Sequence, residues 1–291
     1  MKRPALVVLR HALVALTLVL IASGCSLGPR EDWAEAMRGG FEKAAAGPPS
    51  TVKQSVLVKV IETTIRQTPR PLIEKSTGAA DFSARRARLV ETAKRKAEVV
   101  YDDLVVYAQR SESSIAGTKQ DWARFDYGRE PDVELDDNDR RLAVGAGLIS
   151  PVIAVELLEG VLTGSIEKQG EGMKAGVPTT RYSARLAPDT AVTKLDDEDR
   201  QEGAERMFAT LGVQADDFPV DVWLDAEDNI RAVRYVIRQQ KDRVNAFEMT
   251  LSWEFPDTEP KDARIAIPGR DATIRSDRFS EFVTELIRAF D

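Results

Sequence analysis

Residues 247–253 read Phe-Glu-Met-Thr-Leu-Ser-Trp, which alternates apolar and polar side chains over seven positions. Successive side chains of a β-strand point to opposite faces, so this stretch predicts a strand with one apolar and one polar face. Strands of this kind are typical of antiparallel sheets that are covered on one side. The stretch therefore predicts a sheet whose apolar face packs against a second layer.

The same alternation recurs along the chain. Residues 220–224 and 230–236 flank a polar turn at 226–229 and predict a hairpin. Residues 99–101 and 104–107 predict a second hairpin, which turns at Asp102-Asp103. Shorter patterns predict strands at 56–61, 72–78, 82–89, 166–169, 179–186 and 265–267, and a short strand or a loop at 122–125.

Helical signals interrupt these strands. Ser150-Pro151 is typical of a helix start, and the stripe behind it ends at Gly164. Further helices are expected at 32–46, with an interruption at Gly39-Gly40, at 190–211 before Gly212, and at 278–290. Strand runs broken by helices predict the α+β class, and an antiparallel sheet that curls around helices is one way to enclose a lipid-sized cavity.

The N-terminus has the pattern of a bacterial secretory signal. A basic start is followed by an apolar core at 12–22 and by Ser23-Gly24-Cys25. The core has about half of the ~20 residues that a membrane-spanning helix needs. Residues 21–25 resemble a lipobox, with Ala22 where Leu is commoner. We expect Cys25 to be acylated, by palmitate or similar chains, and to become the mature N-terminus.

Two or three acyl chains would anchor the protein stably at the extracytoplasmic face of the cell membrane. The expected organisation is a signal peptide at 1–24, a lipidated tether and helix at 25–50, and one domain at 51–291 that includes the C-terminal helix. The alternatives are an ordinary secreted protein with a stray cysteine and an uncleaved signal that tethers the chain.

The only histidine, His11, and the only cysteine, Cys25, both lie in or next to the signal. Ser-His-Asp and Cys-His catalysis, His/Cys zinc sites and disulfides are therefore not expected in the mature protein. We expect no cofactor and no metal. The first 24 residues hold three of the 41 Lys and Arg and none of the 48 Asp and Glu, so the remainder carries a charge of −10. This balance argues against a nucleic-acid partner and against broad adhesion to anionic lipid heads.

Several side chains are candidates for a ligand site. Three apolar sets could line a lipid cavity or fill an ordinary core: Val56, Val58 and Val60; Ile153, Leu157, Leu158 and Val161; and Met249, Leu251 and Trp253. Trp122, Trp223 and Trp253 could stack on sugar rings, although ordinary sheet packing is the simpler interpretation.

Charged runs are weaker candidates. Residues 136–139 and 196–199 are acidic but lack the Gly and Glu positions of a calcium-binding EF-hand loop, so helix starts and solvated turns explain them better. The basic residues between Arg85 and Lys96 could contact anionic head groups or form a solvated strand face.

Four segments together resemble a known family. They are 101–107 (Tyr-Asp-Asp-Leu-Val-Val-Tyr) with the following Trp122, 176–182 (Gly-Val-Pro-Thr-Thr-Arg-Tyr), 218–225 (Phe-Pro-Val-Asp-Val-Trp-Leu-Asp), and 247–253. In this order behind a lipobox, and over about residues 50–268, they resemble the actinobacterial LppX/LprG/LprA/LprF lipoproteins.

The resemblance implies a half-barrel, in which a curved antiparallel sheet holds helices in its concave face, similar to the LolA and LolB carriers. It also implies a lipid or acylated glycolipid as the partner, a carrier or chaperone role, and no enzymatic activity. This chain departs from the family at the charged stretch 53–96, at the acidic run near Asp136 and at the C-terminal helix.

Two other functions compete with a carrier. One is an envelope lipoprotein with a filled core that acts as a structural or signalling module. The other is a carboxylate-based hydrolase, which would need two facing acids in a cleft, and no pair in the sequence is a candidate. The lipid, the direction of transport and any transporter partner do not follow from the sequence.

Overall fold

The computed structural model describes residues 30–62, 71–92, 98–109, 121–128, 149–213, 215–242, 245–260 and 263–275. The predicted signal peptide, Cys25, the acidic run 136–139 and the predicted helix 278–290 lie outside these residues.

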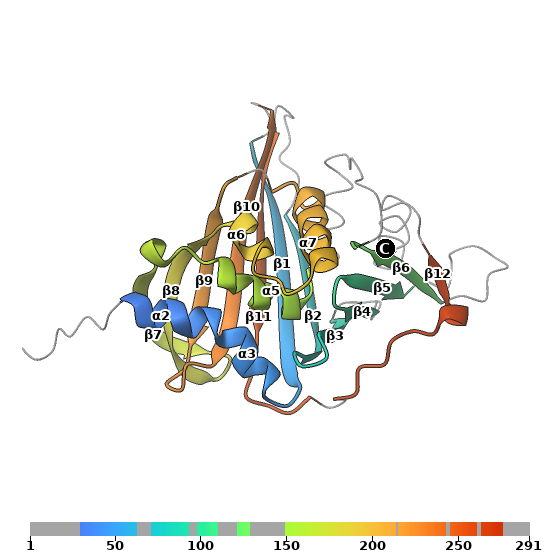
Figure 1. Cartoon of the computed structure of the whole chain (residues 1–291), viewed down its shortest axis with the longest axis horizontal. Coiled ribbons are helices and arrows are strands. Elements are labelled where there is room, and N and C mark those ends of the chain that lie inside the picture. Colours follow the sequence, from blue (N-terminus) through green and yellow to red (C-terminus); the bar gives the residue numbers. More distant parts are fainter. Residues whose placement is uncertain are drawn as a thin grey trace, which may run out of the picture.

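One sheet of twelve strands runs through the described residues, in the order β12-β6-β5-β4-β3-β2-β1-β11-β10-β9-β8-β7 (Figure 1). All neighbours are antiparallel except β12 and β6. The sheet is open, with β7 and β12 at its two edges. The strands are β1 (Ser50–Glu62), β2 (Leu72–Asp81), β3 (Arg86–Glu91), β4 (Glu98–Asp102), β5 (Val105–Gln109), β6 (Trp122–Asp126), β7 (Glu167–Lys174), β8 (Val177–Leu186), β9 (Phe218–Leu224), β10 (Ile230–Asp242), β11 (Asn245–Glu254) and β12 (Thr273–Arg275).

The alternating stretch 247–253 lies within the strand β11, between β1 and β10 in the sheet. Leu251 is opposite Val56 on one side and Tyr235 on the other, and all three side chains are buried. Thr250 and Ser252 alternate with the buried residues and are only partly buried. The predicted two-faced strand is confirmed, and its register aligns the apolar residues of three strands on one face.

Helices cover that apolar face (Figure 1). They are α2 (Arg30–Arg38), α3 (Gly40–Ala45), α5 (Pro151–Glu156), α6 (Pro188–Val192) and α7 (Glu198–Thr210), with 3₁₀ turns η1 (Leu157–Gly160), η2 (Thr163–Ser165) and η3 (Arg270–Ala272). The predicted cap is confirmed, because the Ser150 hydroxyl accepts a hydrogen bond from the Val152 N–H at 3.2 Å.

The apolar stripe behind Ser150 is not one helix to Gly164. It tightens into η1 after Glu156, and Val161 is extended and pairs with Leu186. Gly160 explains the tight packing here, since a Cβ on it would lie 2.4 Å from the Cβ of Ala191 in α6. The helical turns therefore end at Gly160, and Val161 pairs with β8 of the sheet.

Four other expectations need correction. The strand predicted at 82–89 begins only at Arg86, because residues 82–85 form the turn between β2 and β3. The helix predicted at 190–211 is two helices, because Asp197 caps α7 through the N–H groups of Asp199 and Arg200. The turn between β4 and β5 falls at Asp103-Leu104, where Asp103 has a φ of 56°. Residues 265–267 are not a strand.

Residues 265–267 instead belong to a covering segment on the sheet face away from the helices. Ile265 packs there against Ala79, Val100 and Tyr107, and Ile267 lies beside them. Residues 265–267 alternate because this segment is half-buried against the sheet. The last strand, β12, comes at 273–275. The fold class, an α+β protein with a curved antiparallel sheet and helices on one face, is confirmed.

Candidate functional site

The predicted cavity-lining residues lie together in the layer between the sheet and the helices. Nine of the ten have described side chains, and each of these is 4 % exposed or less within one apolar cluster: Val56, Val58, Ile153, Leu157, Leu158, Val161, Met249, Leu251 and Trp253. Val60 lies in β1, opposite Phe247 of β11.

Aromatic contacts fill the middle of this layer. Tyr235 packs edge-on against Phe218 and Trp253, with ring centroids 5.4 Å and 5.5 Å apart. The Tyr235 hydroxyl donates to the Ala154 carbonyl of α5, and the Trp253 indole N–H donates to Gln54 Oε1 at 3.2 Å. The Tyr235 contact joins the sheet to α5, whereas the Trp253 contact joins the neighbouring strands β11 and β1.

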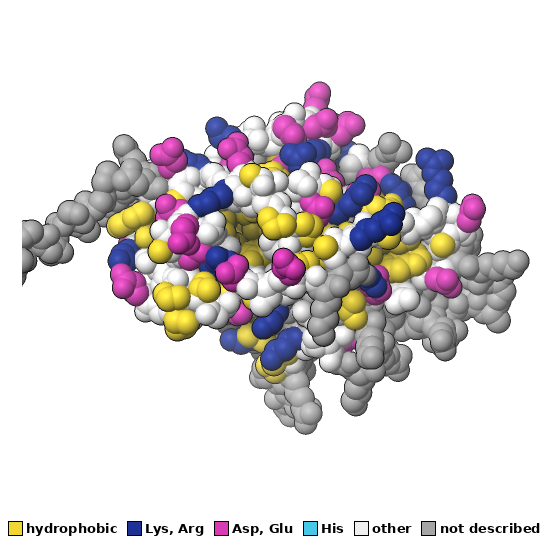
Figure 2. All heavy atoms as spheres, turned by 90° about the horizontal axis from the view of Figure 1, so that it is seen from below, with side chains coloured by type: hydrophobic (Ala, Val, Ile, Leu, Met, Phe, Trp, Pro, Cys, Tyr) yellow, Lys and Arg dark blue, Asp and Glu magenta, His cyan; other side chains and the backbone are white. Residues whose placement is uncertain are grey.

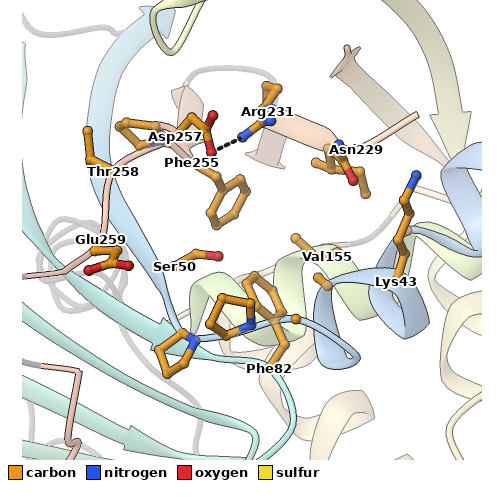
Figure 3. Close-up of a pocket in the computed structure, with 17 residues that line it drawn as sticks. Lys43, Ser50, Phe82, Val155, Asn229, Arg231, Phe255, Asp257, Thr258 and Glu259 are labelled. Atoms are coloured by element: carbon orange, nitrogen blue, oxygen red, sulfur yellow. Dashed lines mark ion pairs between the residues drawn. The ribbon is translucent and has the colours of Figure 1, made fainter. Parts of the chain in front are cut away.

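A cavity of about 390 Å³ opens at one end of this layer (Figure 3). Five segments that are far apart in the sequence surround it, which are α3 with the loop to β1, the β2–β3 turn, α5, the start of β10, and the chain after β11. In the view from below, apolar side chains gather between charged ones on this side of the molecule (Figure 2).

The floor of the cavity is apolar. Phe82, Val155 and Phe255 are 3 %, 1 % and 5 % exposed, and all three belong to the main core cluster. The Phe82 and Phe255 rings meet edge-on at 5.7 Å. The cavity is therefore continuous with the packed layer between sheet and helices.

The rim of the cavity is polar and held by hydrogen bonds. Arg231 pairs with Asp225 at 2.7 Å and with Asp257 at 3.5 Å, and Lys43 donates to the Glu227 carbonyl. Burial would raise the pKa of the Asp225 carboxyl, but hydrogen bonds from Asn229 and Arg231 hold it below its usual value. A charged Asp225 thus fixes the β9–β10 turn that forms one side of the rim.

Glycine allows α3 to approach this turn. A Cβ on Gly40 would lie 2.1 Å from Cδ1 of Ile230, so a larger residue at this helix start would require the Ile230 side chain to move. Sequence reasoning noted Gly39-Gly40 only as a helix interruption. Its second role depends on a contact 190 positions away and could not be read locally.

A buried ion-pair cluster, which we call the Arg200 clasp, joins the helices to the sheet turns. The Arg200 side chain is 10 % exposed and binds Asp103, Glu156 and Asp196 at 2.6–2.8 Å. Arg85 also pairs with Glu156 and Asp196. Burial would lower the pKa of Arg200, but its bonds to Glu156 and Asp103 raise it above the usual value. The clasp connects α5, α6–α7 and the β2–β3 and β4–β5 turns.

The predicted basic stretch is largely paired on the strand surface. Arg86 pairs with Asp102 at 2.9 Å and Arg88 with Glu98 at 2.7 Å, while Lys94 to Lys96 lie outside the described residues. The interpretation as a solvated strand face fits Arg86 and Arg88. Arg85 instead joins the Arg200 clasp.

The tryptophans are not gathered at the cavity. Trp253 is in the core, and Trp122 packs in the small cluster on the outer face of the sheet. Trp223 lies on the outer face beneath Lys174, Arg181 and Arg234, whose charged groups are 5.1–5.7 Å from the ring centroid. These positions support ordinary sheet packing and cation–π contacts for Trp223.

Two features are absent from the described part of the chain. It holds no cluster of three or more side chains that could ligate a metal ion. It also has no helix long and apolar enough to span a bilayer.

No family model and no curated protein matches this chain. Among solved structures, it is similar to the lipoprotein LppX of Mycobacterium tuberculosis, with 15 % identity, 78 % of this chain and 98 % of that chain covered, and a TM-score of 0.35. LprF from Mycobacterium bovis is similar at 14 % identity, with 79 % and 97 % covered and a TM-score of 0.33.

A third match is the MucA/MucB complex of Pseudomonas aeruginosa, at 11 % identity, with 82 % of this chain and 61 % of that chain covered and a TM-score of 0.30. LppX and LprF are members of the lipoprotein group that the sequence motifs resemble. At these identities and TM-scores, the similarity extends only to the general fold. The candidate site is therefore argued from the residues of this chain alone.

Proposed function

We propose that this protein is an envelope lipoprotein that binds a lipid or acylated glycolipid between its sheet and its helices and acts as a carrier or chaperone. The cavity of about 390 Å³ carries the proposal, because its apolar floor continues into the core while its rim is polar. An acyl chain on the floor and a polar group at the rim would match this division.

The cavity volume bears on the size of the ligand. Binding sites for small molecules commonly measure about 300–1,000 Å³, so this cavity is near the lower end. It suits one acyl tail or part of a larger lipid. A lipid with two long tails would need the helices to separate from the sheet, so that Ile153, Leu157 and Met249 become cavity wall.

Solvation explains why no catalytic group is required. Apolar wall residues would shield an acyl chain from water, which stabilises a complex by about 25 cal/mol per Å² of apolar surface removed from water. The proposed role is therefore binding without chemical conversion. We propose that acylated Cys25 holds the domain at the extracytoplasmic face of the membrane, which the lipobox pattern supports.

A second candidate is a lipoprotein with a filled core that acts as an interaction module. The burial of Ile153, Leu157 and Leu251 to 1 % exposure or less favours it, since none of them lines the cavity. The two candidates differ in one respect: only a carrier takes up lipid.

Native mass spectrometry of the full chain, purified from membranes and followed by lipid extraction, tests the proposal. Ala44 lines the cavity and Ala44→Trp would fill it, whereas exposed Ala46, two residues further on, does not line it and Ala46→Trp is the control. We expect a bound lipid in wild type and Ala46→Trp, and a several-fold loss in Ala44→Trp. Absence of any bound lipid, or equal lipid in both variants, would contradict a carrier.

A further inference from the structure

The outer face of the sheet, away from the helices, carries exposed Ile73 beside partly buried Leu57, with lysines around them. Leu57 of β1 is directly opposite Ile73 of β2, and Ile73 is 58 % exposed. Lys53, Lys59 and Lys75 are exposed on the same face of the same two strands. We call these five residues the β1–β2 basic patch.

The three lysines of the patch differ from the other cations of the outer face. Among the described residues, none of the three forms an ion pair, whereas Arg181 and Arg234 share Asp221, and Lys174 pairs with Glu254. Lys53 and Lys59 are opposite Glu254 and Glu248, but these two acids pair with Lys174 and Arg238 instead. The lysine charges of the patch therefore remain available to a partner.

Charge is distributed unevenly between the two sides of the molecule. The helical layer at 33–45, 151–160 and 188–210 holds eleven acids against five bases. By strand register, and counting Asp217 beside Arg185, the outer face of β1, β2 and β7–β11 holds eight bases against six acids among residues with described side chains. The bases are Lys53, Lys59, Lys75, Lys174, Arg181, Arg185, Arg234 and Arg238, and the acids are Asp81, Glu167, Asp217, Asp221, Glu248 and Glu254. Although the whole chain carries a net negative charge, this outer face has more basic than acidic side chains.

We propose that the β1–β2 basic patch docks the domain on an anionic phospholipid bilayer, with the acidic helical layer facing away. Basic clusters are attracted to anionic lipid surfaces, and lysines extend their charged ends to head groups while their stems lie along apolar surface. Leu57 and Ile73 would enter the boundary between head groups and acyl chains. This docking goes beyond cargo binding and does not depend on it.

Lysines around aliphatic side chains, without ion pairs among the described residues, favour a bilayer over an acidic protein as the partner. A specific protein partner is usually met by fixed, paired charges and aromatic or Arg anchors at a packed centre. In this patch the side chains are aliphatic and the cations are lysines without an ion-pair partner in the part of the chain that the structure describes.

Lysine footprinting of the full chain reconstituted into vesicles tests the proposal, because any acyl anchor is then the same in each vesicle. A water-soluble amine-reactive ester is applied in vesicles of phosphatidylcholine alone and of phosphatidylcholine with an equal part of phosphatidylglycerol. We expect Lys53, Lys59 and Lys75 to react several-fold more slowly in the anionic vesicles at low salt, and at equal rates at high salt. Exposed Lys194 of the acidic side is the internal control and should react equally in both.

Two variants with the same charge change sharpen the test. Lys75→Glu should remove most of the protection of Lys53 and Lys59, whereas Lys194→Glu should leave it in place. Ile73→Ser should weaken protection while circular dichroism stays unchanged. Equal reaction rates in both vesicles, equal protection of Lys194, or protection that appears only with added polyglutamate would overturn the proposal. Since cargo is not measured, failure here leaves the carrier proposal intact.

Discussion

At the scale of single residues, Arg200 has the largest number of described ion pairs, to Asp103, Glu156 and Asp196. Arg200→Met removes its charge and leaves Glu156, at 7 % side-chain exposure, buried with only Arg85. Breaking a buried pair in this way costs about 3–5 kcal/mol. We expect a loss of this size in the free energy of unfolding, measured by urea denaturation.

The matched control lies one and a half turns along the same helix. Arg206 pairs with exposed Glu202, a surface ion pair that contributes up to about 1 kcal/mol, and donates to the Tyr127 carbonyl at 3.0 Å, a hydrogen bond that contributes about 0.5–1.5 kcal/mol. Arg206→Met should therefore cost less than Arg200→Met. Equal losses of unfolding free energy in the two variants would show that the Arg200 clasp contributes no more to stability than the Arg206 contacts.

The carboxyl groups predict a stability maximum on the acidic side of neutral pH. Burial, with the neighbouring charge of Glu91, raises the pKa of Glu74, and burial with Glu156 raises that of Glu159. Because the folded protein binds these protons more tightly, stability rises as pH falls through their raised pKa values. Glu74→Gln with Glu159→Gln should flatten this rise in a series of denaturation curves.

Below that range the balance reverses. Burial alone would raise the pKa of Asp221, but bonds from Ser183, Arg234 and Arg181 lower it, and Arg200 lowers that of Asp196. A depressed carboxyl pKa stabilises the fold above the unfolded value of 3.8, and the contribution is lost as pH falls through the folded pKa. Stability that kept rising below pH 3.8 would contradict these assignments.

Some of these residues were predictable and others were not. Ser150 follows local capping rules and was expected from the sequence. The Arg200 clasp joins residues 97 and 44 positions apart, and no local pattern carries that information. At 196–199 the sequence indicated only an acidic run of the kind found at helix starts.

At the scale of elements, Gly78 sets the spacing between β2 and β3. A Cβ on Gly78 would lie 1.8 Å from the carbonyl oxygen of Arg88, which is backbone and cannot rotate away. Overpacking of this kind costs roughly 1–3 kcal/mol, and occasionally more. We expect Gly78→Ala to lower the free energy of unfolding by at least about 2 kcal/mol.

Gly172 provides the control on the edge strand β7. Nothing lies within 4 Å of a Cβ placed there, so Gly172→Ala should stabilise the protein slightly, by less than about 1 kcal/mol, because the unfolded chain loses freedom. A Gly78→Ala protein as stable as Gly172→Ala would show that β2 and β3 are spaced differently.

Strands were predictable wherever one face is buried. Met249, Leu251 and Trp253 alternate with polar residues because only one side of β11 meets the helices. The edge strand β7 is exposed along nearly its whole length, so no alternation marks it, and only its start was expected. Ile265 led to a wrong strand prediction, because a segment that packs on a sheet can alternate buried and exposed residues as a strand does.

At the scale of the whole molecule, the α+β class followed from the sequence, while the cavity did not. Its floor and rim come from five segments between Gly40 and Glu259, and their meeting depends on the register of the entire sheet. The sequence indicated an apolar layer, and the structure places its opening at Phe82, Val155 and Phe255.

Photo-crosslinking of the full chain with a phospholipid that carries a diazirine in one acyl chain tests the central claim most directly. Peptide mass spectrometry then locates the label. If lipid binds between the sheet and the helices, we expect the label at Phe82, Val155 and Phe255. Unlabelled lipid should displace this label, and the label should be lost in Ala44→Trp. Label confined to the outer face of the sheet, or label that unlabelled lipid does not displace, would contradict binding between sheet and helices.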